Sequence, residues 1–269
     1  MLTNPRADRV RAVSALRKRS VRQRTGRFGV EGPQGVREVV RYAADRVRDV
    51  YVTPEAAVRY DADIVVPARA AGLWVHEVSP EVLAAMADAE APQGVLAVVD
   101  VAEPTLDDVL AAAPRLLVLL TNVRDPGNAG TVIRGADAAG ADAVLVSESS
   151  VDVLSPKVVR STAGSLFHLP VVTGLDTDAT LAALSAAGVR TYAADGAGAT
   201  LLPDADLAVA HCWVMGNEAW GLPAETRERC DDVVRVPIHG RAESLNLAMA
   251  ATICLYASAS VQRSGPTAR

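Results

Sequence analysis

Three polar side chains stand at the entrance of an apolar helical stretch near the end of the chain. The segment HGRAESLNLAMAATICLYASA, residues 239–259, is apolar nearly all the way round from Leu247 onward, which predicts a buried helix. Glu243, Ser244 and Asn246 come directly before it. Short polar residues at a helix start usually cap free backbone N–H groups, and this stretch alone favours that role. The same groups are also suited to binding a substrate.

A second segment with reactive side chains is CWVMGNEAWGLPAE, residues 212–225. Gly216 and Gly221 enclose a carboxylate, Glu218, and an indole, Trp220. Glycines permit close approach of the backbone to another group. An ordinary turn explains one glycine and a proline at a helix start, but it does not readily explain a carboxylate and a tryptophan held between two glycines.

The third segment is TNVRDPGNAGTVIRGADAAGAD, residues 121–142. It lacks the G-x-G-x-x-G pattern, so a dinucleotide-binding fingerprint is absent. It offers an amide, Asn128, and a guanidinium, Arg134. A helix that begins near Asn128 places Arg134 nearly two turns on, where it points at a neighbour or into solvent rather than at the loop.

Regular alternation of strands and helices positions these segments. Strands are expected near 115–121, 142–147, 189–194, 207–215 and 233–238, with helices near 128–139, 155–166, 177–187, 222–229 and 244–260. This order predicts an α/β fold with a parallel sheet and helices on both faces. Ligands bind such sheets outside the carboxyl ends of the strands, where all three segments lie, so the segments predict one site.

The first part of the chain reads as a smaller α/β domain. Helices are expected at 5–24, 33–42, 54–59 and 80–88, and strands at 28–32, 47–52, 73–78 and 95–101. Proline and acidic residues then mark a linker with a short helix. The expected division is 1–100, a linker at 101–114, and 115–269.

Composition indicates a globular cytoplasmic protein. Half of the 269 residues are hydrophobic, no apolar run is long enough to span a membrane, and the N-terminus lacks a secretory h-region. The cysteines are odd in number and the histidines scattered, so neither a disulfide framework nor a metal site is expected. Residues 1–48 hold thirteen Lys or Arg and four Asp or Glu, a net charge of +9 that leaves −14 for the rest of the chain. Such a basic arm slightly favours nucleic acid as a partner.

Three motifs together resemble a known family. NAGTVIR (128–134), VMGNEAWGLP (214–223) and VPIHGRAESLNLAMA (236–250) resemble, in order and spacing, the signature motifs of the SpoU/TrmH RNA 2′-O-ribose methyltransferases of the SPOUT superfamily. SPKVVRSTAGSLFHLPV (155–171) is similar to the segment that connects them. Before residue 100, FGVEGPQGVREVV and APQGVLAVV resemble the ribosomal-protein-like RNA-binding domain of many members.

The resemblance implies a deep trefoil knot, bound S-adenosylmethionine without a metal, and a homodimer with composite active sites. It implies that the catalytic and substrate side is formed by Asn128, Arg134, Glu218, Ser244 and Asn246. It implies cofactor contacts, largely through backbone, from Gly216, Val236, Ile238 and Leu245. The basic residues expected to meet RNA are Arg17, Lys18, Arg19, Arg22, Arg24, Arg27 and Arg160.

The implied reaction is methylation of a ribose 2′-hydroxyl, which makes RNA rather than DNA the substrate. Ribosomal RNA is favoured because the first domain resembles a ribosomal protein; transfer RNA, or a catalytically inactive RNA-binding protein, is the alternative. A guanidinium is a poor base, so Arg134 is expected to clamp a phosphate and stabilise the developing alkoxide. The general base and the target nucleotide stay open. Trp220 is expected either to stack on a base or to pack at the dimer interface.

Overall fold

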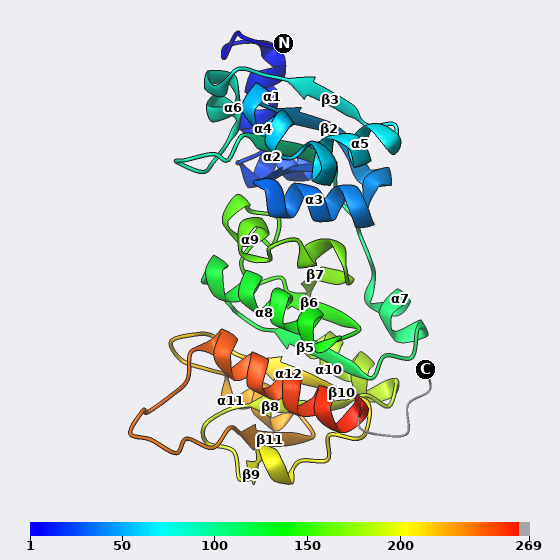
Figure 1. The fold of residues 1–269 in the computed structure, drawn as a ribbon. Coiled ribbons are helices and arrows are strands. Elements are labelled where there is room, and N and C mark those ends of the chain that lie inside the picture. The colour runs from blue at the N-terminus through cyan, green and yellow to red at the C-terminus, as the bar shows by residue number, and fades with distance from the viewer. Residues whose placement is uncertain (264–269) are drawn as a thin grey trace. The chain divides into compact units, whose positions relative to one another are not determined.

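A parallel sheet of seven strands forms the centre of the second half of the chain in the computed structural model, which describes residues 1–263 (Figure 1). Its order is β7-β6-β5-β10-β8-β11-β9. The strands are β5 (Leu116–Leu120), β6 (Ala143–Ser147), β7 (Val171–Leu175), β8 (Arg190–Ala194), β9 (Thr200–Leu201), β10 (His211–Met215) and β11 (Asp232–Arg235). The expected α/β class is therefore confirmed. The sequence reading missed β7 and β9, which are the two edge strands: β9 has two residues, and the register of β7 is irregular.

Helices cover both faces of this sheet, as alternate side chains of the strands show. Leu117 and Leu119 of β5 join one core with α7 (Leu106–Ala111) and α10 (Thr177–Ala186). The opposite face meets α12 (Leu247–Arg263), because Ser258 of α12 accepts a hydrogen bond from the indole of Trp213 in β10 at 2.9 Å. On that face α12 packs against α8 (Pro126–Ala139), and a side chain at Gly135 would lie 2.9 Å from the Thr252 hydroxyl. The short helix α11 (Ala224–Glu228) precedes β11.

The expectation of a helix near 244–260, buried from Leu247 onward, was wrong in two respects. The helix begins at Leu247, and Ser244 does not cap it. Asn246 accepts hydrogen bonds from the backbone N–H groups of Ala248 and Met249 at 2.9 and 3.3 Å, so of the polar residues before the helix it is the asparagine that caps it. Moreover, one stripe of α12 is exposed, at Met249, Ile253 and Tyr256.

The first half of the chain builds a smaller sheet with the order β1-β4-β2-β3. The strands are β1 (Arg27–Glu31), β2 (Val47–Val52), β3 (Trp74–Glu77) and β4 (Val95–Asp100), and the helices are α1 (Asp8–Ala15), α2 (Arg19–Thr25), α3 (Pro33–Tyr42), α4 (Pro54–Arg59), α5 (Val66–Ala70) and α6 (Pro80–Met86). One helix was expected over 5–24, but the extended backbone of Lys18 separates α1 from α2. This break turns Arg22 inward, where 4% of the residue is exposed.

The segment Asp152–His168, which includes α9 (Pro156–Ser161), belongs to the same compact unit as Met1–Ala102. The buried Arg22 guanidinium pairs with Asp152, and Arg160 donates to Glu31 at 3.1 Å and to Asp88 at 2.9 Å. Glu103–Val151 and the chain from Leu169 form the second unit. The division at 1–100, 101–114 and 115–269 stays a prediction about which parts fold independently.

Within residues 1–263, no helix combines the length and apolar character that crossing a bilayer requires.

Candidate functional site

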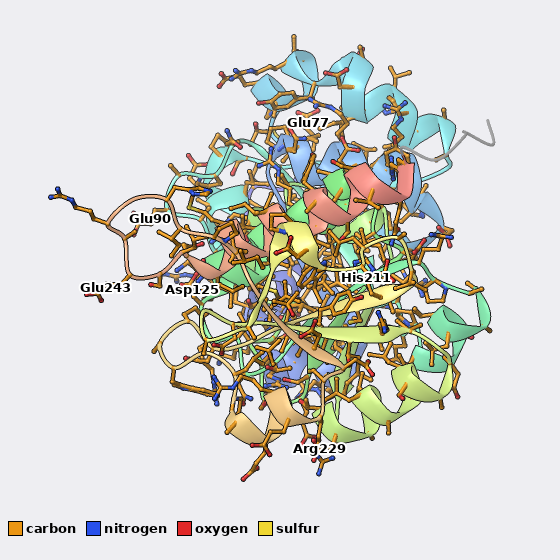
Figure 2. All side chains as sticks on the ribbon, turned by 90° about the horizontal axis from the view of Figure 1, so that it is seen from below. Glu77, Glu90, Asp125, His211, Arg229 and Glu243 are labelled. Carbon is orange, nitrogen blue, oxygen red and sulfur yellow. The ribbon has the colours of Figure 1, made fainter. Side chains whose placement is uncertain are left out.

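A cavity of about 400 Å³ lies at the carboxyl edge of the large sheet. The ends of β8, β10 and β11 and the loop before α12 supply its walls, and this loop extends away from the sheet to Glu243 (Figures 1 and 2). The structure brings together here six residues that the sequence predicted for one site. They are Gly216, Glu218, Val236, Ile238, Ser244 and Leu245.

The loop after β10 closes on itself and forms one wall of the cavity. Asn217 and Gly221 exchange two backbone hydrogen bonds, at 2.8 and 2.9 Å. A side chain on Gly216 would lie 2.3 Å from the carbonyl carbon of Gly221, so residue 216 must be glycine for this loop to close. The amide of Asn217 donates to the carbonyl oxygen of Asn122 at 2.7 Å and ties the loop to the end of β5. The wall is therefore fixed before any ligand enters.

Glu218 is held at the start of α8 by backbone groups. Its carboxylate accepts hydrogen bonds from the N–H groups of Arg124 and Asp125 at 3.1 and 2.9 Å. Burial acts to raise the pKa of Glu218, but these amides, its own backbone N–H and the Asn128 side chain outweigh burial, so the pKa is lowered. An ionised carboxylate that already accepts several hydrogen bonds is better suited to holding two loops together than to removing a proton.

Two asparagines connect Glu218 to α12. Asn246 donates from Nδ2 to Oδ1 of Asn128 at 3.0 Å, and Asn128 donates from Nδ2 to Oε1 of Glu218 at 3.4 Å. Because Oδ1 of Asn246 caps α12 and the carboxylate can only accept, the orientation of both amides is determined. Hydrogen bonds thus link three of the predicted catalytic residues, one from each motif.

The other two predicted catalytic residues are placed differently. Ser244 lines the cavity on the exposed loop before α12. Arg134 lies on the exposed surface of α8, outside the cavity lining, and makes no ion pair with any residue of the described part of the chain. Trp220 lines the cavity with 56% of the residue exposed.

The basic residues predicted to meet RNA divide into two groups. Arg22 is buried on Asp152, and Arg160 is engaged by Glu31 and Asp88, so neither side chain is free for a phosphate in this conformation. The others are exposed: Arg17, Lys18, Arg19, Arg24 and Arg27, of which Arg27 pairs with Asp100 at 3.3 Å.

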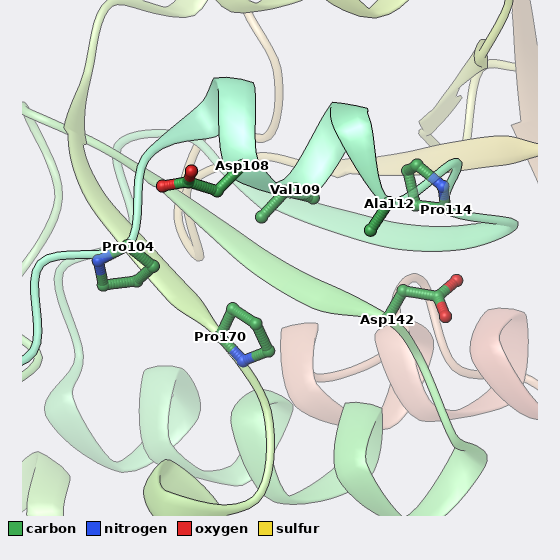
Figure 3. Close-up of a pocket in the computed structure, with 7 residues that line it drawn as sticks. All are labelled: Pro104, Asp108, Val109, Ala112, Pro114, Asp142 and Pro170. Carbon is green, nitrogen blue, oxygen red and sulfur yellow. The ribbon is translucent and has the colours of Figure 1, made fainter.

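A smaller cavity of about 200 Å³ lies near the opposite ends of the strands, beside α7 (Figure 3). Three prolines contribute to its lining, and both carboxylates that reach it are engaged. Asp142 accepts hydrogen bonds from the backbone N–H groups of Arg115 and Leu116, and Asp108 accepts one from that of Thr105. Compared with the cavity at the carboxyl edge, this smaller cavity has few polar groups available to bind a ligand.

The sequence reading missed two charged residues of the larger cavity, Asp195 and Arg227. The loop after β8, ADGAG, carries the signal that could have found Asp195, because it also follows a strand of the parallel sheet. The described residues contain no cluster of His, Cys, Asp and Glu that could hold a metal ion. Cys212 and Cys254 are buried free thiols, and burial raises the pKa of Cys254 to about 12.

Comparison with known proteins gives matches along almost the whole chain. Residues 115–256 match the model of the SpoU rRNA Methylase family, and residues 7–97 match that of the MRM3-like substrate binding domain. The chain is 32% identical to the 23S rRNA (guanosine(2553)-2′-O)-methyltransferase RlmP of Bacillus subtilis, over 93% of this chain and 95% of RlmP.

Comparison with solved structures also finds methyltransferases similar to this chain. The AdoMet-bound rRNA methyltransferase from Sinorhizobium meliloti is 30% identical with a TM-score of 0.81, over 96% of both chains. The SpoU methyltransferase AviRb from Streptomyces viridochromogenes, in complex with AdoMet, is 30% identical with a TM-score of 0.84, over 96% of this chain and all of AviRb.

Proposed function

The chain belongs to the SpoU rRNA methylase family, and from this premise we propose that it transfers a methyl group from S-adenosylmethionine to a ribose 2′-hydroxyl of ribosomal RNA. The observation that carries the proposal is the cavity at the carboxyl edge, where Gly216, Val236, Ile238 and Leu245 meet Glu218 and Ser244. Ribosomal RNA is preferred to transfer RNA because the relative RlmP and the Sinorhizobium meliloti protein are named for ribosomal RNA.

The residues present fit S-adenosylmethionine. The cavity volume lies within the range of about 300–1,000 Å³ typical of small-molecule sites, and its lining combines apolar side chains with polar and charged groups. Residue 216 has no side chain, because a Cβ there would collide with Gly221. The backbone groups of Gly216, which line the cavity, can therefore contact a ligand directly. Arg227 neutralises Asp195, and the remaining carboxylates of the lining, Glu218 and Glu243, give the cavity a negative character that suits a sulfonium cation.

The bound cofactor supplies a methyl group that is already activated, so the protein contributes mainly by positioning. The linked Glu218, Asn128 and Asn246 fix the loops that carry the three motifs. Ser244 lies on the cavity wall, and we assign it to a hydrogen bond with the target ribose. Arg134 is the permanent positive charge of the set, and we assign it to the phosphate and the developing alkoxide rather than to proton removal. Glu218, with its lowered pKa, is not assigned as the base.

A homodimer with composite sites is part of the proposal. Met249, Ile253 and Tyr256 form an exposed apolar stripe on α12, and a second copy that covers it would account for the apolar sequence of this helix. Arg134 on the neighbouring α8 lies outside the cavity of its own chain, which favours its use in the site of the partner. The trefoil knot and a cytoplasmic location are kept as further predictions from the family resemblance.

The test is transfer of a labelled methyl group from S-adenosylmethionine to total ribosomal RNA and, separately, to total transfer RNA. Wild type is compared with Arg134→Ala and with Arg229→Ala, a control at an exposed arginine that pairs with Asp178 outside the cavity. We expect label in ribosomal RNA, mapped to a ribose, with wild type and Arg229→Ala, and strongly reduced label with Arg134→Ala.

Label only in transfer RNA would overturn the assigned substrate. Measurable cofactor binding without transfer to either pool would favour an RNA-binding protein without catalysis. Light scattering of wild type and Ile253→Asp tests the dimer: a wild-type monomer at micromolar concentration refutes it.

A further inference from the structure

Asp195 is a carboxylate on the cavity wall to which the family resemblance gave no role. It directly follows β8, and its backbone is fixed by two hydrogen bonds: its N–H donates to the carbonyl oxygen of Val234 at 3.1 Å, and its own carbonyl oxygen accepts from the N–H of Gly198 at 3.1 Å. A side chain at Gly198 would lie 2.5 Å from the carbonyl oxygen of Val233, so the turn is tightly packed on β11. The carboxylate is therefore presented from a rigid turn.

The side chain of Asp195 is mostly buried and only partly used. Its exposed fraction is 14%. Oδ1 accepts from the N–H of Ala197 at 2.9 Å, and Oδ2 accepts from the guanidinium of Arg227 at 3.2 Å. A carboxylate has about four acceptor positions, so about two stay open beside the cavity.

The other polar side chains of the lining are used or exposed. Both groups of the Asn217 amide are engaged, and the Glu218 carboxylate accepts from two backbone N–H groups and Asn128. Glu243 and Ser244 lie on the exposed loop before α12. Among the lining residues, Asp195 thus combines low exposure with acceptor positions that the protein leaves open.

Charge decides which kind of donor suits these positions. Arg227 already neutralises Asp195, and its guanidinium lies beside the same cavity, so a second cation such as the ammonium group of methionine would be repelled. Two neutral hydroxyl groups meet no such repulsion, and a vicinal diol presents two O–H donors side by side. A carboxylate after a strand of a parallel sheet is a known way to bind ribose hydroxyls.

We propose that Asp195, oriented by Arg227 and the Ala197 amide, accepts hydrogen bonds from the ribose diol of the adenosine half of the cofactor. The proposal rests on the proposed function, because it assigns the cavity to S-adenosylmethionine. It makes Asp195 a determinant of specificity for a ribonucleoside ligand and gives Arg227 a positioning role.

Calorimetric binding to three probes tests this assignment without an activity measurement. The probes are S-adenosylhomocysteine, 5′-methylthioadenosine, which lacks the amino acid portion, and the 2′,3′-dideoxy form of the latter. They are measured with wild type, Asp195→Asn, and Asp178→Asn as a matched control, since Asp178 also pairs with an arginine but lies outside the cavity.

We expect wild type and Asp178→Asn to bind 5′-methylthioadenosine at least about tenfold more tightly than its dideoxy form, as hydrogen bonds to a charged group imply. Asp195→Asn should weaken S-adenosylhomocysteine and 5′-methylthioadenosine by similar factors and leave the dideoxy compound nearly unchanged. A purely structural role for Asp195 would instead weaken all three probes alike.

Three results would overturn the inference: equal binding of 5′-methylthioadenosine and its dideoxy form by wild type, equal weakening of all probes in Asp195→Asn, or weakening of S-adenosylhomocysteine alone. Thermal unfolding checks that the variant folds, and Asp195→Ser replaces it if it does not. Failure of wild type to bind any probe would refute the cofactor assignment itself, which is a different outcome.

Discussion

Replacement of Asn246 by aspartate separates two functions that one amide performs. Oδ1 of Asn246 caps α12 through the N–H groups of Ala248 and Met249, while Nδ2 donates to Asn128. Asn246→Asp keeps an oxygen for the cap and adds negative charge near a helix N-terminus, which is worth about 0.3–1 kcal/mol. It replaces the donor to Asn128 by an acceptor. The cap should therefore survive while the link between the motifs is lost.

The cost of the lost link follows from the contacts around Asn128. If its amide keeps its orientation, two oxygens face each other across the 3.0 Å contact. If the amide turns over, its oxygen faces the Glu218 carboxylate across the present 3.4 Å contact. One contact between two oxygens persists either way. Because these side chains are exposed, water can replace the lost partner, so the cost is that of one hydrogen bond, about 0.5–1.5 kcal/mol. That corresponds to a decrease in kcat/KM of roughly 2- to 13-fold.

The assays are methyl transfer to ribosomal RNA and unfolding in urea. We expect Asn246→Asp to keep its free energy of unfolding within about 1 kcal/mol of wild type, and Asn246→Ala, without the cap, to lose about 0.5–2 kcal/mol. Asn4→Asp is the control, because Asn4 accepts from the N–H of Arg6 on the exposed surface and has no link to the site. Wild-type activity of Asn246→Asp would refute the role of the link, and a loss of stability equal to that of Asn246→Ala would refute the role of the cap.

Three further perturbations test other parts of the structure. Asp152→Ala leaves the buried charge of Arg22 unpaired, so we expect urea unfolding to show a free energy of unfolding lower by about 3–5 kcal/mol. The double variant Asp152→Leu with Arg22→Met, which removes both charges, should recover part of this loss. Burial lowers the pKa of His211, so the folded state resists protonation of this side chain. The free energy of unfolding should therefore fall as the pH drops below about 6.5, by up to about 1.4 kcal/mol per pH unit. His211→Gln should make the free energy of unfolding less dependent on pH in this range. Gly216→Ala places a methyl group 2.3 Å from the carbonyl carbon of Gly221, and calorimetry should show at least about tenfold weaker binding of S-adenosylhomocysteine.

Each of these expectations has a result that contradicts it. Asp152→Ala with wild-type stability would mean that Arg22 finds water in place of its partner. An identical pH profile in wild type and His211→Gln would mean that His211 titrates as it does in the unfolded chain. For Gly216→Ala the control is Gly29→Ala, since an added Cβ at Gly29 meets nothing within 4 Å; equal binding by both variants would contradict the closed-loop argument.

The sequence predicted most of the sheet because its inner strands are strongly apolar and alternate with amphipathic helices. β5 and β10 are buried at every position, which gives a clear signal. β7 and β9 gave little signal because edge strands can be short and need not be fully buried. The cavity residues that the sequence predicted come from motifs that resemble those of a known family, whereas Asp195 follows β8 outside these motifs and was missed.

Side-chain partners were the least predictable feature of the chain. Nothing in the local sequence distinguishes Arg22 from Arg19 or Arg24, because inward or outward direction depends on the break at Lys18. Likewise, the pairing of Arg160 with Glu31 joins residues 129 positions apart. The spacing of apolar residues predicts which face of a helix or strand is buried, but it does not predict which charged side chain of another element lies opposite that face.

The grouping of Asp152–His168 with the first unit has a consequence for how the protein is made. Phe167 stacks on Phe28 of β1 with ring centroids 6.4 Å apart, and Asp152 neutralises the buried Arg22, so the first unit needs residues that are synthesised long after Ala102. Domains usually fold in order as they leave the ribosome. Here the N-terminal unit can complete its core only when the ribosome has passed residue 168, by which time β5 and β6 of the next unit have already been synthesised. A nascent chain arrested between residues 102 and 152 would therefore carry a first unit in which Phe28 lacks Phe167 and the buried Arg22 lacks Asp152.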